Sequence, residues 1–73
     1  MKDIITNEML SKKLKASRIS VGLTQEQVAD LLGVTRATFN SYENNPGNVA
    51  ISVFQKLANI YKLNVSDFFT ETH

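Results

Sequence analysis

Residues 35–44 carry small and polar side chains at positions that would share one face of a helix. At about 100° per residue, one arc of about 140° holds Arg36, Ala37, Asn40, Ser41 and Asn44. The opposite side holds Thr38, Phe39, Tyr42 and Glu43. The chemistry of the first arc is that of hydrogen bonding to base edges. Arginine pairs bidentately with guanine, asparagine pairs with adenine, and an alanine methyl group can touch that of thymine.

A polar face alone is weak support for base recognition, because any exposed helix presents polar residues to water. The stretch before it is more informative. Thr24 is a candidate N-cap, and Gln27 completes a capping box. Apolar positions at helical spacing follow at Val28, Leu31 and Leu32, and Ala29 is small enough for a close approach of another helix. Gly33 can then end the helix in the left-handed conformation, and Thr35 is a second N-cap candidate. These features predict a helix-turn-helix, whose second helix can enter a DNA major groove.

A longer pattern surrounds this stretch. It comprises Leu14, Arg18, Gly22-Leu23-Thr24-Gln25, Val28-Ala29, Leu32-Gly33-Val34-Thr35, Phe39 and Tyr42-Glu43-Asn44, then Phe54, Lys56-Leu57-Ala58, Tyr61, Leu63, Val65-Ser66 and Phe69. The pattern resembles the Cro/phage-repressor (XRE) family over about residues 10–69, with the spacing intact from Leu14 to Glu43. The resemblance implies a compact, lambda-repressor-like DNA-binding domain of four or five helices, with helices 2 and 3 forming the helix-turn-helix.

The resemblance also implies roles for single residues. The base-contacting positions are Arg36, Ala37, Asn40 and Ser41, with Arg36 and Asn40 foremost. The phosphate-contacting positions are Gln25, Thr35 and Asn44, and the N-terminus of its helix would assist Gln25. Two of these positions have plainer interpretations. Gln25 is also an ordinary N-terminal polar residue, and Asn44 with Asn45 could form a C-cap and its left-handed neighbour.

Arg18 and Glu43 form a further implied pair. The resemblance places them in a partly buried salt bridge that holds the reading helix against the rest of the domain. This role is structural, and the bridge would contribute strongly to the stability of so small a domain.

The third loop departs from the family pattern. Many relatives carry glycine soon after the glutamate and then a basic residue, whereas this chain has Asn45 at the glycine position. No lysine or arginine lies between Arg36 and Lys56. Fewer charged phosphate contacts predict weak nonspecific DNA binding and a shallow salt dependence.

Length and composition narrow the class of protein. Seventy-three residues, of which 42% are hydrophobic, make one small globular domain. The chain has no cysteine and a single histidine, His73, so we expect no metal site and no cofactor. The sequence shows no nucleophile–base constellation, no paired carboxylates and no Gly-rich phosphate loop, so we expect that the chain is not an enzyme. It lacks an 18-residue apolar run and a signal-peptide core, which predicts a cytoplasmic protein. The family resemblance implies that the protein is bacterial or phage-encoded.

The net charge of +1 does not by itself indicate that the chain binds nucleic acid. Six of the eight basic residues lie in the first half of the sequence. Lys12, Lys13 and Lys15 are more typical of a solvated helix face than of a phosphate clamp, although they could steer the protein toward DNA.

The order of elements predicts an all-α domain. A lead-in over residues 1–6 precedes a domain over residues 7–70, and a tail covers residues 71–73. Asn7 is expected to cap a first helix through about Ser20, with Leu10, Leu14 and Ser17 facing inward. A turn over residues 44–48 precedes a helix over about 49–61, whose core side holds Ile51, Phe54, Leu57 and Ala58. Ser66 is expected to cap a last short helix.

Specific binding by so small a domain usually needs two copies on half-sites about 34 Å apart. Apolar candidates for a dimer interface are Ile60, Tyr61, Val65, Phe68 and Phe69, although most of them could belong to the core. We expect a sequence-specific transcriptional regulator, a repressor, that binds a palindromic double-stranded operator as a homodimer. A phage repressor, a restriction–modification controller and an antitoxin all fit this size. The alternative is a protein-interaction module whose main partner is another protein, such as a toxin or an anti-repressor.

Overall fold

The computed structural model describes residues 6–69. Residues 1–5 and 70–73, and with them most of the predicted lead-in and the whole of the predicted tail, lie outside this range. The elements are α1 (Asn7–Ser20), α2 (Gln25–Leu32), α3 (Arg36–Asn44), a short 3-10 helix η1 (Pro46–Asn48), α4 (Ile51–Tyr61) and α5 (Ser66–Phe69). The described part of the chain contains helices and turns and no strand, so the predicted all-α class is confirmed.

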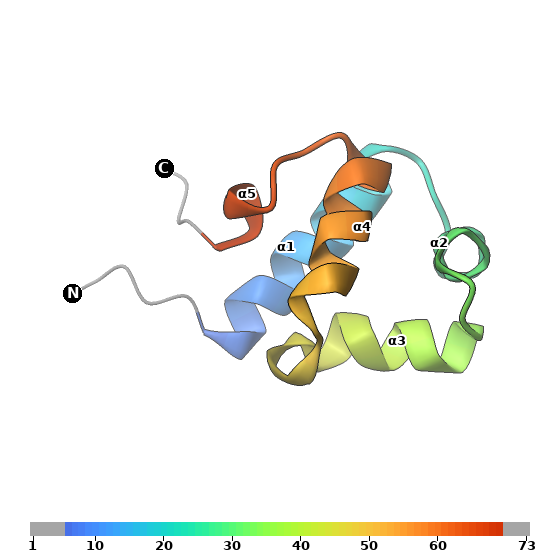
Figure 1. Ribbon diagram of the computed structural model, residues 1–73, viewed down its shortest axis with the longest axis horizontal. Coiled ribbons are helices and arrows are strands. Elements are labelled where there is room, and N and C mark those ends of the chain that lie inside the picture. The colour runs from blue at the N-terminus through green and yellow to red at the C-terminus, as the bar shows by residue number, and fades with distance from the viewer. Residues whose placement is uncertain (1–5, 70–73) are drawn as a thin grey trace.

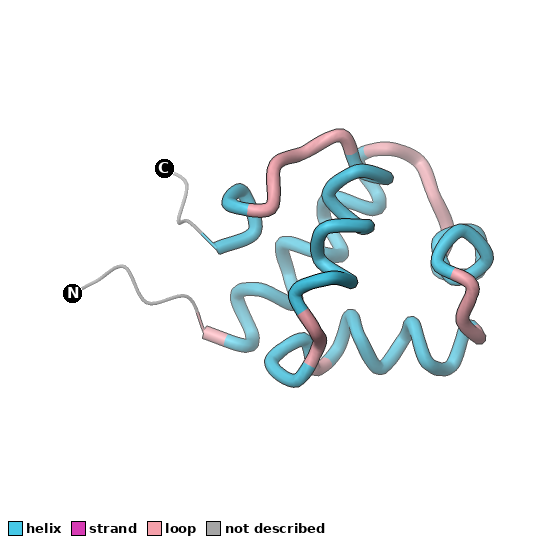
Figure 2. Tube along the Cα trace, viewed as in Figure 1, coloured by secondary structure: helices cyan, strands magenta, loops and turns pink. Residues whose placement is uncertain are grey.

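The helices are arranged so that α3 lies along one edge of the molecule (Figure 1). The view looks along the axis of α2, which crosses the N-terminal end of α3, while α1 and α4 form the centre. Only short connections separate the helices (Figure 2). The α2–α3 pair therefore has the arrangement of a helix-turn-helix, with one flank of α3 left at the surface.

Local sequence signals determine the turn between α2 and α3. The Thr24 hydroxyl accepts from the backbone N–H of Gln27, and the Gln27 side chain accepts from the backbone N–H of Thr24, so the predicted capping box is present. Gly33 ends α2 in the left-handed conformation, with φ 78°. The Thr35 hydroxyl then accepts from the backbone N–H of Thr38 and caps α3. All three local predictions are confirmed.

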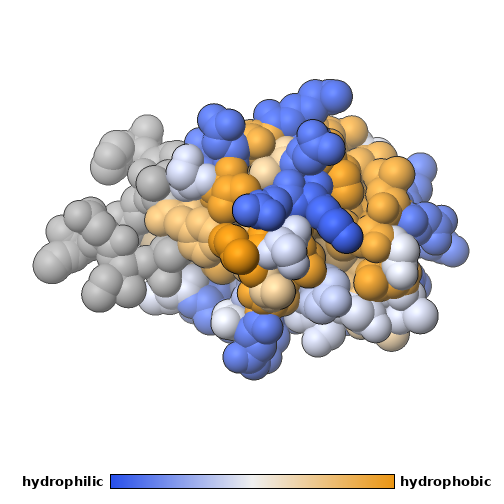
Figure 3. All heavy atoms as spheres, in the orientation of Figure 1, coloured by the Kyte–Doolittle hydropathy of each residue, from blue (hydrophilic) through white to orange (hydrophobic). Residues whose placement is uncertain are grey.

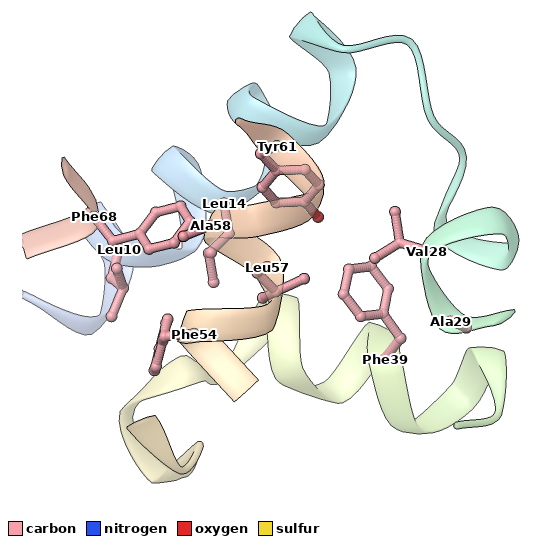
Figure 4. Packing of buried hydrophobic residues seen from close by; sticks show 10 residues of the cluster. All are labelled: Leu10, Leu14, Val28, Ala29, Phe39, Phe54, Leu57, Ala58, Tyr61 and Phe68. Atoms are coloured by element: carbon pink, nitrogen blue, oxygen red, sulfur yellow. The ribbon is translucent and has the colours of Figure 1, made fainter. Parts of the chain in front are cut away.

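The core lies where α1, α4 and α5 meet the inner sides of α2 and α3 (Figure 4). The buried hydrophobic residues are Leu10, Leu14, Val28, Ala29, Phe39, Phe54, Leu57, Ala58, Tyr61 and Phe68. Phe54 contacts both aromatic rings of α5, with ring centroids 6.0 Å from Phe68 and 5.1 Å from Phe69. Phe39 is fully buried, and it ties the inner side of α3 to this core.

Ile51, which is predicted to face the core, is exposed, and so is Leu31, one of the apolar positions at helical spacing. Leu31 is 62% exposed, because α2 turns Val28 and Ala29 inward and leaves Leu31 at the margin of this narrow stripe. Ile51 is 56% exposed. It is the first residue of α4, one turn before the buried stripe that begins at Phe54.

The predicted caps at the two ends of the domain were wrong in detail. Thr6, not Asn7, caps α1, because the Thr6 hydroxyl accepts from the backbone N–H of Met9. Asn7 instead accepts from the backbone N–H of Gly47 at 2.6 Å and donates to Asn45 Oδ1 at 3.0 Å. Ser66 is the first residue of α5 and not its cap, and the Asp67 side chain accepts from the backbone N–H of Asn64, two residues before the helix.

Candidate nucleic-acid interface

The outer face of α3 carries the predicted base-contacting residues. Arg36, Ala37, Asn40 and Ser41 are all exposed, as is Asn44 in the last turn. On the inner face, Phe39 and Glu43 are fully buried. A hollow of about 480 Å³ lies on the outer face and is lined by Gln25, Arg36, Ala37 and Asn40. The structure therefore brings three of the four base-contact candidates together with the first residue of α2.

Arg18 and Glu43 form an ion pair between α1 and α3. Arg18 Nε donates to Glu43 Oε2 at 2.6 Å, and Nη2 lies 3.4 Å from Oε1. Arg18 Nη1 also donates to the carbonyl of Leu23 at 2.9 Å. The Glu43 side chain is 0% exposed and that of Arg18 is 14% exposed. The pair is thus partly buried, as the family resemblance implies, with the Glu43 carboxylate wholly inside the domain.

Gln25 extends this ion pair to the surface of α3. Gln25 Nε2 donates to Glu43 Oε1 at 3.0 Å and to Asn40 Oδ1 at 2.9 Å. Sequence analysis missed both contacts, because the spacing of residues along the chain holds no signal for how α2 docks on α3. The two N–H groups of the Gln25 amide are occupied, so a hydrogen bond from this amide to a phosphate would have to replace one of them. The first backbone N–H groups of α2 lack intrahelical partners, as at any helix N-terminus.

The other phosphate-contact candidates lie at the two ends of α3. Thr35 is exposed, and its hydroxyl donates to Thr38 Oγ1 at 2.9 Å in addition to capping the helix. Asn44 is still helical, and the C-cap residue is Asn45. Asn45 has φ −139°, so it is not the left-handed neighbour that the plainer interpretation predicts. Its side chain accepts from Asn7, which ties the end of α3 to the start of α1.

Two of the three lysines on α1 interact within the protein. Lys12 Nζ lies 4.0 Å from Glu8 Oε2, with both side chains highly exposed. Lys13 Nζ donates to the carbonyl of Asp67 at 3.2 Å. The Lys12 contact fits the solvated-face interpretation, because an exposed ion pair contributes little energy.

The five dimer-interface candidates divide into two groups. Tyr61 and Phe68 are 3% and 1% exposed and belong to the core, with ring centroids 6.5 Å apart, so neither is available to a second copy. Ile60, Val65 and Phe69 are partly buried against the same core. Figure 3 shows one face of the molecule, on which hydrophilic residues over α4 separate two groups of hydrophobic residues. A dimer through the C-terminal part stays a prediction, with at most three of the five residues available.

A buried hydroxyl lies near the ion pair. Tyr61 Oη has no hydrogen-bond partner within residues 6–69. Burial raises the pKa of the Tyr61 hydroxyl well above its ordinary value, the Glu43 carboxylate raises it further, and Arg18 lowers it in part.

Two further findings concern metal binding and membrane crossing. Within residues 6–69, no group of three or more histidine, cysteine, aspartate or glutamate residues could hold a metal ion. None of the helices in this part of the chain has the length and hydropathy needed to cross a membrane.

This fold and this exposed α3 face define a helix-turn-helix protein, and comparison with known families agrees. A helix-turn-helix family model matches residues 14–68, most of the chain, so the chain belongs to this family, and the predicted XRE-type resemblance is confirmed.

Among its relatives, the HTH-type transcriptional regulator PuuR of Escherichia coli K12 is 38% identical over 60 residues. This match covers 82% of the chain and 32% of PuuR. The prophage-derived HTH-type transcriptional regulator YonR of Bacillus subtilis is 32% identical over 65 residues, covering 89% of the chain and 60% of YonR. The antitoxin HipB of Escherichia coli K12 is 30% identical over 63 residues, covering 86% of the chain and 72% of HipB. The chain thus spans about a third of PuuR and three fifths of YonR. No solved structure matches the chain.

Proposed function

We propose that this chain is a sequence-specific DNA-binding transcriptional regulator, a repressor that binds a palindromic operator as a homodimer. The observation that carries the proposal is the division of α3 into two faces. Arg36, Ala37, Asn40 and Ser41 are exposed on one side, while Phe39 and Glu43 anchor the other in the core. A helix held in this way can place its outer residues in the major groove without unfolding any part of the domain.

The expected roles follow from the chemistry of each side chain. Arg36, at the start of α3, can pair with guanine O6 and N7, and the Ala37 methyl group can touch a thymine methyl. Phosphates would be held by the N-terminus of α2 at Gln25, by Thr35 and by Asn44. The relatives named as transcriptional regulators support this class of function.

Selection from a random DNA duplex library tests the proposal, followed by titration of the selected duplex at two salt concentrations. We expect a two-fold symmetric sequence. Arg36→Ala is expected to weaken binding by about 1–3 kcal/mol and to relax specificity at one base position. Lys62→Ala, at an exposed position of the α4–α5 connection, serves as the control and should leave base preference unchanged. Selection without enrichment would overturn the proposal.

A second candidate is a protein-interaction module, and the match to a protein named as an antitoxin favours it. In that case, Arg36→Ala and Asn40→Ala would be harmless to function, whereas substitutions at Ile60, Val65 or Phe69 would not. Sedimentation of the free chain separates a homodimer from a monomer, and sedimentation of variants at Ile60, Val65 or Phe69 tests whether these partly buried residues contribute to pairing.

A further inference from the structure

We propose that Gln25 determines specificity by positioning Asn40, so that Asn40 directs its N–H donors, and not its carbonyl oxygen, toward the DNA. This inference rests on the proposed function and names the chemistry of the base that Asn40 reads. That base offers a hydrogen-bond acceptor at the contacted atom of the major groove.

The orientation originates at the buried ion pair. Glu43 is fully buried and forms an ion pair with the guanidinium of Arg18 at 2.6 Å. An ionised carboxylate can only accept hydrogen bonds, and a guanidinium can only donate them. Any third group that contacts Glu43 must therefore be a donor.

Gln25 is this third group, and the need for a donor at Glu43 decides which end of the Gln25 amide faces inward. A glutamine amide has an acceptor end and a donor end of nearly the same shape. Only the donor end satisfies the carboxylate, which places Nε2 3.0 Å from Glu43 Oε1. The second N–H of Nε2 then points to Asn40 at 2.9 Å.

The pairing of a donor with an acceptor also decides the orientation of the Asn40 amide. The Asn40 amide meets an N–H of Gln25, so it turns Oδ1 toward Gln25. The reverse orientation would place two NH₂ groups against each other. Asn40 Nδ2, which carries two N–H groups, is left for a ligand, while Oδ1 has already used one of its lone pairs. Asn40 is exposed beside Arg36 and Ala37 in the hollow on α3. The buried Glu43 carboxylate therefore determines, through Gln25, that Asn40 presents hydrogen-bond donors at this surface.

The base edges differ in the way this orientation requires. Guanine O6 and N7, adenine N7 and thymine O4 are acceptors in the major groove, whereas cytosine offers only the N4 donor. An asparagine that is free to turn its amide could adapt to either kind of edge. With Gln25 in place, cytosine is the base that Asn40 disfavours.

The test uses duplex selection with the full chain and four variants. Asn40→Ala identifies the base position that Asn40 reads, because preference is lost there. At this position, the affinity for the preferred base relative to cytosine is expected to be about tenfold in the wild type. In Gln25→Ala the ratio should fall to about threefold or less, because the amide can turn. Glu26→Ala, one residue further along α2 and exposed, is the matched control and should keep the wild-type ratio.

This ratio separates positioning from a phosphate contact. Loss of a phosphate contact weakens binding to every sequence by a similar factor and leaves the ratio unchanged. The fourth variant, Asn40→Asp, reverses the presented group: Gln25 can still donate to one oxygen, and the other now accepts. Its preference should shift to cytosine.

Three results would overturn the inference. They are a cytosine preference in the wild type, an unchanged ratio in folded Gln25→Ala, and an Asn40→Asp variant that keeps the wild-type base. An enriched motif with any of these results leaves the proposed function intact. Selection without enrichment overturns both proposals.

Discussion

Arg18 and Glu43 lie 25 positions apart in the sequence, yet Arg18 Nε is 2.6 Å from Glu43 Oε2, and the carboxylate is wholly inside the domain. The pair joins α1 to the inner side of α3, opposite the face that carries Arg36 and Asn40. Through Gln25 it also reaches that outer face. One buried interaction therefore holds the helix in place and orders the polar groups on its surface.

Glu43→Gln is expected to lower the free energy of unfolding by about 3–5 kcal/mol, because it leaves the Arg18 charge buried without a counter-charge. That loss is comparable with the whole stability of a small domain. Thermal unfolding followed by circular dichroism measures it. Glu8→Gln is the matched control: Glu8 is 81% exposed, and its pairing with Lys12 is long. The control should change stability by less than about 1 kcal/mol. Equal melting temperatures for the two variants would contradict a structural role for the bridge.

Tyr61→Phe is expected to leave stability at neutral pH unchanged or slightly higher, because the hydroxyl makes no hydrogen bond within residues 6–69. At alkaline pH the two proteins should diverge. Burial raises the pKa of Tyr61 in the folded state above its ordinary value of 10.0. Above pH 10 the unfolded chain therefore binds fewer protons than the folded one, and stability falls as pH rises.

Above pH 10, the free energy of unfolding of the wild type is expected to fall relative to that of Tyr61→Phe by up to about 1.4 kcal/mol per pH unit. Below about pH 10 the two proteins should show the same slope. Denaturant unfolding of wild type and Tyr61→Phe between pH 8 and pH 11 (about three units, chosen to bracket the ordinary tyrosine pKa) measures it. Tyr42 is present in both proteins, so its titration cancels in the comparison. Parallel stability curves over the whole range would show that burial does not hold the proton on Tyr61.

Asn7→Ala and Gly47→Ala are expected to destabilise the domain by about 1 kcal/mol each, because both break the same hydrogen bond. Asn7 Oδ1 accepts from the backbone N–H of Gly47, and a Cβ at Gly47 would lie 2.9 Å from this oxygen. The double variant should therefore cost about as much as either single one. Chemical denaturation of the four proteins completes the cycle. Additive losses would show that the effect of Gly47→Ala on stability does not depend on the hydrogen bond between Asn7 and Gly47.

Lys62→Gly is expected to stabilise the domain by about 0.5–1 kcal/mol, because Lys62 ends α4 with φ 61°, a conformation that favours glycine. Gly33→Ala is its counterpart at the end of α2. A Cβ at Gly33 would meet no atom within 4 Å, so its expected loss of about 1 kcal/mol is purely conformational. Lys62→Ala keeps a Cβ and should gain nothing. A stabilisation by Lys62→Ala as large as that by Lys62→Gly would assign the effect to the lysine side chain and not to the backbone.

Part of the fold was predictable because it depends on neighbours in the sequence. The caps at Thr24 and Thr35 use contacts across three residues, and Gly33 acts through its own backbone. The prediction failed at Ile51, and Leu31 is exposed although it shares the helical spacing of Val28. Helical spacing gives the side of a helix on which a residue lies but not how far a neighbouring element covers it. The prediction also failed at Asn7, whose partner is 40 residues away.

The candidate site divides in the same way. The sequence alone determined which residues share the outer arc of α3 and, through the family pattern, that Arg18 and Glu43 pair. Only the tertiary structure decided that Gln25 lies between Glu43 and Asn40, and that Tyr61 and Phe68 are core residues. The physical reason is that a helix period fixes directions around one axis. Contacts between helices depend on where those axes cross, and that is set by the packing of the whole core.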